Sequence, residues 1–185
     1  NLKIKNKWIS IISKNAILAK DVEIGEGTLV MPMAGLGSRF DKTDYNLPKP
    51  LIPVDNIPMA VKAYKDLPLA NRNLSIFRKD LPSLDLLKNE LETSFKNLDF
   101  YELEEVTNGQ AISCYEAIKN TQEIDLPLTI SACDNGVIYD YAKFMSLMEN
   151  TSIDIIVWVA RGYPGAVRNP EMYGWVDVDP DGRIR

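Results

Sequence analysis

Two short stretches of the sequence combine residues that suit the binding of phosphate groups. The first is Gly35-Leu36-Gly37-Ser38-Arg39, and the second, a little further along, is Pro48-Lys49-Pro50. Glycines let the backbone approach a phosphate closely, and successive amide N–H groups can surround an anion. Arg39 adds a fork of donors suited to a leaving pyrophosphate. Lys49, held between two prolines, can place an ammonium group over a reacting phosphate at low entropic cost.

Three later stretches add residues that could contact a ligand. Cys133-Asp134-Asn135 directly follows an apolar run, so Asp134 is expected at the end of a buried strand. Gly109-Gln110 is expected at the start of a helix, and Tyr173-Gly174 at the entry to a strand. Taken singly, each stretch also has a purely structural interpretation, as a turn, a helix N-terminus or a strand entry.

The composition narrows the chemistry that the chain can perform. The sequence has 185 residues, a net charge of −5 and no histidine, which excludes Ser-His and Cys-His catalysis and zinc bound through histidine. A negative chain is unsuited to a nucleic-acid surface. Cys114 and Cys133 lack metal or redox spacing and predict free thiols in a reducing compartment. No apolar run resembles a membrane span or signal peptide, so we expect a cytoplasmic protein without membrane or nucleic-acid partners.

Strands and helices are expected to alternate along the chain. Apolar runs predict strands at 28–33, 74–77, 98–103, 127–133, 153–160 and 174–178. Apolar residues at helical spacing predict helices around 60–67, 84–95, 111–118 and 141–148. This alternation predicts an α/β fold whose largely parallel sheet is covered on both faces. The turns at 35–39 and 134–135 both follow strands, so we expect them on the edge where such folds bind ligands.

Residues 1–30 leave two interpretations open. Small or apolar residues recur at every sixth position, at Ala16, Val22 and Thr28 and at Leu18, Ile24 and Val30. This spacing resembles hexapeptide-repeat acyltransferases and predicts a short left-handed β-helix fragment before a domain that spans 31–185. Thr28–Val30 cannot be both a coil of that β-helix and the first strand of the next domain. Either residues are missing near positions 30 and 31, or the spacing is accidental.

In their order and spacing, the stretches between about Leu29 and Ile184 resemble the nucleotidyltransferases that make NDP-sugars, the NDP-sugar pyrophosphorylases. The resemblance implies a Rossmann-like three-layer sandwich of the nucleotide-diphospho-sugar transferase type. It also implies an enzyme that transfers a nucleoside monophosphate from an NTP to a phosphorylated small molecule and releases pyrophosphate. The expected acceptor is a sugar 1-phosphate, activated for the synthesis of surface polysaccharides.

The same resemblance implies roles for individual residues. The nucleotide-binding residues would be Ala34, Gly35, Leu36, Gly37, Ser38, Arg39, Gly109 and Gln110. Arg39 and Lys49 would be the catalytic residues, Asp134 a Mg²⁺ ligand, and Tyr173 and Gly174 would bind the acceptor. Cys133 departs from the glycine or alanine of many members. The family's second metal aspartate and its glutamate-lysine sugar contact would lie beyond Arg185, so the domain is expected to be truncated at its C-terminal end.

Two other functions stay open. The stretch from Gly35 to Phe40 resembles cytidylyltransferases equally well, and their acceptor would be a phosphorylated non-sugar such as phosphocholine or an amino-acid-derived phosphate. The chain could instead be a regulatory relative that binds a nucleotide without turnover, although Arg39, Lys49 and Asp134 are all present. These motifs determine neither the nucleobase nor the acceptor, and they are compatible with a monomer or a homo-oligomer.

Overall fold

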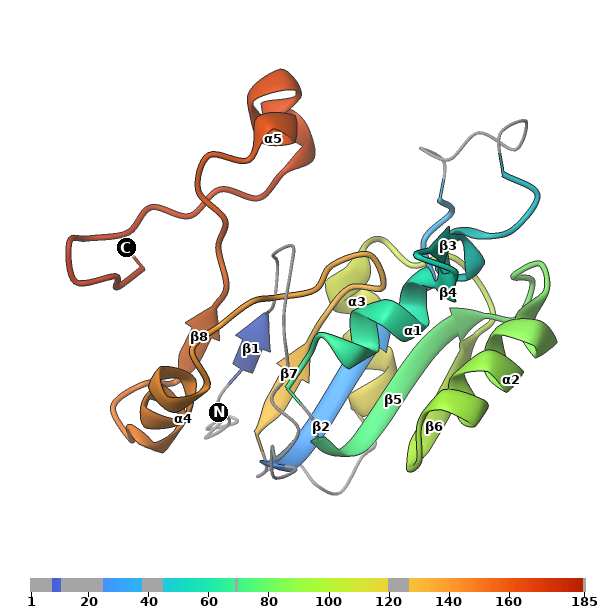
Figure 1. Cartoon of the computed structure of the whole chain (residues 1–185), viewed down its shortest axis with the longest axis horizontal. Helices are drawn as coiled ribbons and strands as arrows, with labels where there is room; N and C mark the ends of the chain where they lie inside the picture. The colour runs from blue at the N-terminus through green and yellow to red at the C-terminus, as the bar shows by residue number, and fades with distance from the viewer. Residues whose placement is uncertain (1–7, 11–24, 38–44, 69, 120–126, 185) are drawn as a thin grey trace.

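The computed structural model describes residues 8–10, 25–37, 45–68, 70–119 and 127–184. Its centre is a six-stranded sheet of order β6-β5-β2-β7-β1-β8 in which every neighbouring pair is parallel (Figure 1). The strands are β1 (Trp8–Ser10), β2 (Gly25–Pro32), β5 (Ala70–Arg78), β6 (Leu98–Leu103), β7 (Leu128–Ile130) and β8 (Ile155–Val157). The predicted α/β class and parallel sheet are confirmed, and the arrangement is compatible with a Rossmann-like fold.

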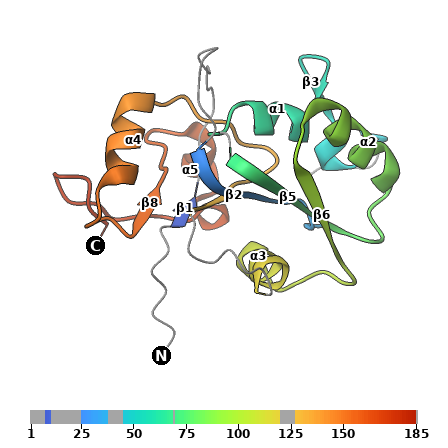
Figure 2. The ribbon, with the colours of Figure 1, turned by 90° about the horizontal axis from the view of Figure 1, so that it is seen from below.

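Helices cover both faces of the sheet. On one face lie α1 (Met59–Lys65), α2 (Leu84–Ser94) and α4 (Tyr141–Glu149), and on the other lies α3 (Gln110–Ile118) (Figure 2). Successive side chains of β2 point to opposite faces, as the pleat of a strand requires. Leu29 and Met31 therefore join the core beneath α1 and α2, whereas Val30 joins the core beneath α3. No described helix combines the length and the apolar composition needed to cross a membrane.

A small hairpin precedes α1 and connects it to the segment that carries Lys49. A 3-10 helix, η1 (Lys49–Leu51), leads into the antiparallel strands β3 (Pro53–Val54) and β4 (Ile57–Pro58). The two turn residues, Asp55 and Asn56, have φ values of 53° and 62°, which matches a two-residue hairpin turn of type I′. The Met59 N–H then donates to the Ile52 carbonyl (2.9 Å), so η1 is held against the start of α1.

The structure departs from the predicted elements in the C-terminal part of the chain. No strand forms at 174–178; only Val178 forms an isolated bridge, with Ile184. The turn between them is present, because Asp179 accepts hydrogen bonds from the backbone N–H groups of Asp181 (3.0 Å) and Arg183 (2.8 Å). The sequence analysis also missed the short helices α5 (Pro164–Arg168) and η2 (Pro170–Met172).

The predicted domain boundary between residues 30 and 31 falls inside β2. Gly25–Pro32 is one continuous strand, and its residues Thr28–Val30 pair with Leu128–Ile130 of β7. Of the two interpretations of Thr28–Val30, the structure therefore shows the sheet strand. The other four repeat positions, Ala16, Leu18, Val22 and Ile24, lie outside the described residues.

Candidate active site

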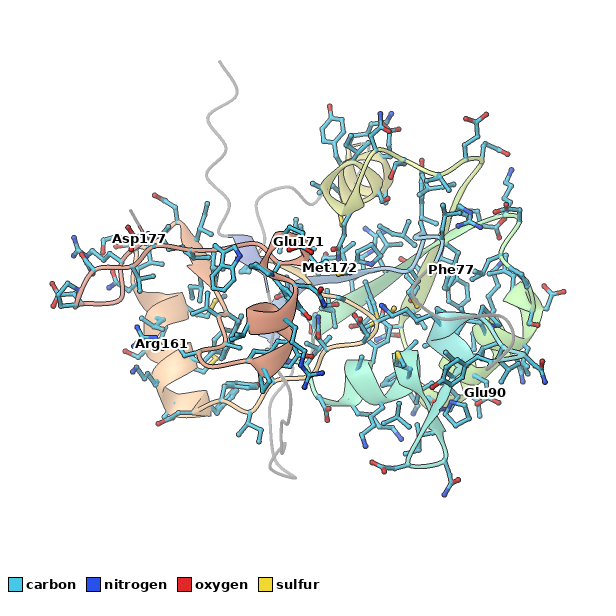
Figure 3. All side chains as sticks on the ribbon, turned by 90° about the horizontal axis from the view of Figure 1, so that it is seen from above. Phe77, Glu90, Arg161, Glu171, Met172 and Asp177 are labelled. Atoms are coloured by element: carbon cyan, nitrogen blue, oxygen red, sulfur yellow. The ribbon has the colours of Figure 1, made fainter. Side chains whose placement is uncertain are left out.

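One cavity of about 1150 Å³ opens at the carboxyl ends of β2, β7 and β8. All strands of the sheet point toward this edge, so the segments that follow them converge there (Figure 1). Figure 3 views the same edge, with Met172 in the C-terminal segment that crosses it and contributes to the cavity wall. This is the position at which parallel α/β sheets bind ligands.

The cavity brings together most of the residues that were singled out in the sequence. Its walls include Ala34, Gly35, Gly37, Lys49, Gly109, Gln110, Asp134, Tyr173 and Gly174. Leu36 does not line it, because that side chain turns to solvent and is 71% exposed. Ser38 and Arg39 lie outside the described residues, so their predicted contacts stay predictions.

Gly35 lies in the turn after β2, and nothing in the described fold requires a glycine there. Its φ is not positive, and an added Cβ would meet no described atom within 4 Å. Gly27 is the opposite case, since its φ is 134° and an added Cβ would lie 2.4 Å from the Pro127 carbonyl oxygen. Because Gly35 lines the cavity, its missing side chain leaves room for a ligand rather than for the protein's own packing.

Lys49 and Asp134 form an ion pair inside the cavity. Lys49 Nζ lies 2.5 Å from Asp134 Oδ2, and the two side chains are 16% and 30% exposed. Lys49 begins η1 and is followed by the buried residues Pro50 and Leu51. The ammonium group is therefore carried by an anchored segment and held next to the end of β7.

Gln110 is the first residue of α3 and has a defined orientation. Its Nε2 donates to the Ser131 carbonyl oxygen over 2.8 Å. A carbonyl oxygen can only accept, so this contact determines which end of the carboxamide is the nitrogen. Gln110 also lines the cavity, and a carboxamide carries both a donor and an acceptor, which is the pattern needed to pair with a nucleobase edge.

The cavity also contains residues that the sequence analysis missed. The segment after β8 contributes Arg161 and Tyr163, and Trp175 lines the cavity two positions after the predicted Tyr173. The rings of Tyr163 and Tyr173 meet edge-to-face with centroids 5.7 Å apart. Trp175 Nε1 donates to the Pro170 carbonyl (2.8 Å), although the side chain is 69% exposed. The rule that ligands bind after parallel strands would have pointed to the segment following β8.

Cys133 precedes Asp134 and is unsuited to nucleophilic chemistry. The side chain is buried, and burial raises the pKa of its thiol to about 11. A thiol with this pKa stays protonated near neutral pH, and the thiolate is the reactive form. Cys133 therefore contributes packing beside Asp134 rather than a nucleophile.

The cavity fits a magnesium ion only if a ligand supplies most of its oxygens. Among the described residues, no group of three or more Cys, Asp or Glu side chains is arranged to hold a metal. Of the described residues that line the cavity, only Asp134 carries a carboxylate. Mg²⁺ commonly binds through one or two carboxylates together with substrate phosphates and water. Asp134 is thus suited to an ion that arrives with a polyphosphate.

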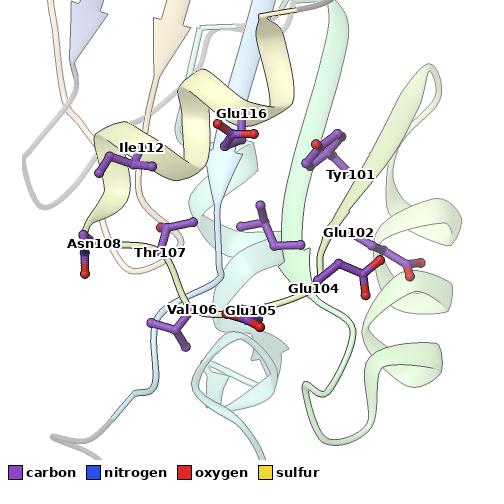
Figure 4. A pocket seen from close by; sticks show the side chains of 10 residues that line it. Tyr101, Glu102, Glu104, Glu105, Val106, Thr107, Asn108, Ile112 and Glu116 are labelled. Carbon is purple, nitrogen blue, oxygen red and sulfur yellow. The ribbon is translucent and has the colours of Figure 1, made fainter.

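A second, smaller hollow of about 570 Å³ lies between β6 and α3 (Figure 4). Four glutamates line it, Glu102, Glu104, Glu105 and Glu116. Glu102 is ion-paired with Lys88, Glu104 with Lys79, and Glu116 with Lys119. None of the described residues that line this hollow is a cation that could neutralise a phosphate, so the larger cavity is the candidate site for an anionic ligand.

The charge of the larger cavity differs from that of the chain. Its described charged residues are Lys49, Arg161 and Asp134, two cations and one anion, in a chain of net charge −5. A local positive balance of this kind favours an anionic ligand.

A scan against protein-family models gave no match for this sequence, and a search of curated proteins also found no similar protein.

Proposed function

We propose that this chain is a nucleotidyltransferase that transfers a nucleoside monophosphate from an NTP to a phosphorylated small molecule, with a sugar 1-phosphate as the expected acceptor. The observation that carries the proposal is one cavity lined by Gly35, Lys49, Gln110 and Asp134, which come from four separate segments of the chain. The finer fold type, a sandwich of the nucleotide-diphospho-sugar transferase kind, is part of the same proposal.

In the proposed complex, the triphosphate lies along the turn that contains Gly35 and Gly37. Lys49 donates to the reacting phosphates, and Gln110 presents its amide edge to the base. Mg²⁺, when bound, neutralises charge on the phosphates. Tyr173 and Gly174, on the opposite wall, hold the acceptor.

The reaction needs positioning more than proton transfer. An oxygen of the acceptor phosphate attacks the α-phosphorus in line, and pyrophosphate leaves from the opposite side. The acceptor phosphate is already an anion near neutral pH, so no general base is required. A chain without histidine is suited to such a reaction, because orientation and charge neutralisation supply the catalysis.

The Lys49–Asp134 ion pair would be exchanged when the nucleotide binds. Without ligand, each side chain neutralises the other across 2.5 Å. With Mg²⁺ and NTP, the ammonium group of Lys49 turns to the phosphates and the carboxylate of Asp134 turns to the metal ion. The pair thus keeps both groups at the cavity before the substrate arrives, and binding exchanges their mutual contact for contacts with the phosphates and the metal ion.

The direct test is pyrophosphate release by the full-length protein with Mg²⁺. ATP, CTP, GTP, UTP and dTTP are each combined with sugar 1-phosphates, phosphocholine and phosphorylated amino acids. Release that requires both an NTP and a sugar 1-phosphate supports the proposal. Release with CTP and a non-sugar phosphate would identify the cytidylyltransferase alternative, and nucleotide binding without release would identify a regulatory protein.

Gly35→Ala should weaken NTP binding without destabilising the fold. The added methyl group has room in the described structure but occupies space that a phosphate needs. We expect the NTP dissociation constant to rise about 10–100-fold, which corresponds to losing a charge-assisted hydrogen bond of about 1.5–3 kcal/mol. Isothermal titration calorimetry and thermal unfolding measure the two effects separately.

Gly27→Ala is the matched control. Gly27 does not line the cavity, and the added methyl group would collide with the Pro127 carbonyl oxygen at 2.4 Å. This variant should lower the melting temperature while the folded fraction binds NTP normally. If Gly35→Ala binds NTP as tightly as the wild type does, the turn after β2 does not contact the phosphates.

A further inference from the structure

Arg78, the last residue of β5, contacts the turn that follows β2. Its side chain is buried, with only 8% of its surface exposed. Nη1 donates to the carbonyl oxygens of Ala34 (3.2 Å) and Gly35 (3.3 Å), and Nε donates to Asp80 Oδ1 (2.7 Å). The hydrogen bond from Arg78 also lowers the pKa of Asp80, so this partner stays ionised. One guanidinium group thus connects the end of β5 to the turn after the neighbouring strand.

This contact determines where the next N–H groups of the turn point. In a planar trans peptide the C=O and the following N–H point in opposite directions. With the carbonyls of Ala34 and Gly35 held toward Arg78, the N–H groups of Gly35 and Leu36 point away from it. Neither N–H donates a hydrogen bond to any described residue. Ala34 and Gly35 line the cavity and Arg78 does not, so we infer that the side of the turn opposite Arg78, where these donors lie, is the side that a ligand in the cavity would meet.

The charge of Arg78 adds to the effect of its geometry. A guanidinium group is always ionised near neutral pH and has five donors in a rigid plane. Its acidic partner, Asp80, is 71% exposed and therefore well screened by water, whereas the guanidinium is buried against the turn. A buried positive charge behind a turn with outward N–H groups favours an anion in front of that turn.

We propose that Arg78 is a positioning residue for the triphosphate: it holds the carbonyls of Ala34 and Gly35 so that the following N–H groups meet the phosphates, while it touches no substrate itself. This inference rests on the proposed function, since it assumes that the cavity takes an NTP. It assigns a role in phosphate binding to a residue outside the cavity wall.

The test compares the dissociation constants of two probes for Arg78→Gln and for the wild type. The first probe is whichever of ATP, CTP, GTP, UTP and dTTP the wild type binds best. The second is the corresponding nucleoside. We expect the NTP dissociation constant to rise at least about tenfold, the equivalent of one charge-assisted contact. Nucleoside affinity should stay unchanged, because the base contacts do not involve Arg78. In turnover, KM for the NTP should rise while KM for the acceptor stays the same.

Arg72→Gln is the matched control. Arg72 belongs to the same strand and also pairs with an exposed aspartate, Asp99 (2.8 Å), but it does not line the cavity or contact the turn. Its substitution should leave both affinities unchanged. Arg78→Lys should recover part of the NTP affinity, because it keeps the charge but cannot donate to both carbonyls and to Asp80 in one plane.

The outcomes separate this inference from the proposed function. A wild-type protein that binds no NTP would overturn both. If the wild type binds NTP, two results for Arg78→Gln would overturn the role of Arg78 alone. One is an equal loss of NTP and nucleoside affinity, and the other is no loss of either. If Arg78→Gln does not fold, Arg78→Lys decides the matter by the same comparison, and an unchanged ratio of the two affinities overturns the inference.

Discussion

Lys49→Ala is expected to lower turnover by roughly 10²–10³-fold, the scale for losing one preorganised charged contact in a catalytic site. Lys49 is held in the cavity by η1, and its ammonium group is the described cation nearest to the end of β7 where Asp134 lies. Its removal withdraws positive charge from the reacting phosphates. It also leaves the carboxylate of Asp134 to repel them. Steady-state pyrophosphate release by the full-length protein measures the effect as kcat and kcat/KM.

Lys62→Ala is the control for this variant. Lys62 is also paired with an aspartate, Asp55, but the pair lies on α1 and the β3–β4 turn, outside the cavity lining. Its turnover should match the wild type. Near-normal turnover in Lys49→Ala would mean that the ammonium group does not act on the reacting phosphates.

Lys49→Ala should also lower the stability of the fold slightly. An exposed loop lysine could be replaced at no cost, but the Lys49 side chain is only 16% exposed and ion-paired. Partly buried pairs lie between surface pairs, which contribute little, and fully buried ones, whose disruption costs several kcal/mol. We therefore expect a loss of about 1 kcal/mol in the free energy of unfolding, measured by urea denaturation.

Much of the fold could be predicted because most elements bury one regular stripe of side chains. Helices α1, α2 and α3 each present buried residues at helical spacing, and β2 alternates between two cores. Helix α4 buries Phe144 and packs the partly buried Met145 and Met148 against the same core. In contrast, α5 and η2 have no buried residues, so their sequences carry no regular spacing of apolar residues from which a helix could be predicted. The hairpin of β3 and β4 had a usable signal, the Asp55-Asn56 pair, whose residue types tolerate positive φ.

The candidate site could be predicted only where its residues follow strands in a recognisable order. Gly35 and Asp134 come directly after β2 and β7, and parallel strands bring such positions to one edge. Arg78 also ends a strand, but its role depends on contacts with Ala34 and Gly35, more than 40 positions away in sequence. A contact of that kind is set by how neighbouring strands align, which spacing within one segment cannot show.

Asp134→Asn has the second large expected effect, a loss of Mg²⁺ dependence together with a fall in turnover of roughly 10²-fold or more. Asp134 supplies the only carboxylate among the described residues that line the cavity. Asparagine has nearly the same size and can still accept a hydrogen bond from Lys49, so the fold should be preserved. It lacks the negative charge that holds a divalent ion, and the ion would then depend on the phosphates alone.

The substitution separates the two roles that Asp134 could have. Asparagine forms turns as readily as aspartate, so a residue that only shapes the turn after β7 would tolerate it. Asp140→Asn is the matched control, because Asp140 lies outside the cavity lining. Asp140 caps α4 by accepting a hydrogen bond from the Lys143 N–H (3.0 Å), and asparagine caps helices equally well. In the wild type and the control, Mg²⁺ should strengthen NTP binding, whereas in Asp134→Asn the NTP dissociation constants with Mg²⁺ and with EDTA should nearly coincide. A Mg²⁺ titration and turnover that match the wild type would show that Asp134 only shapes the turn.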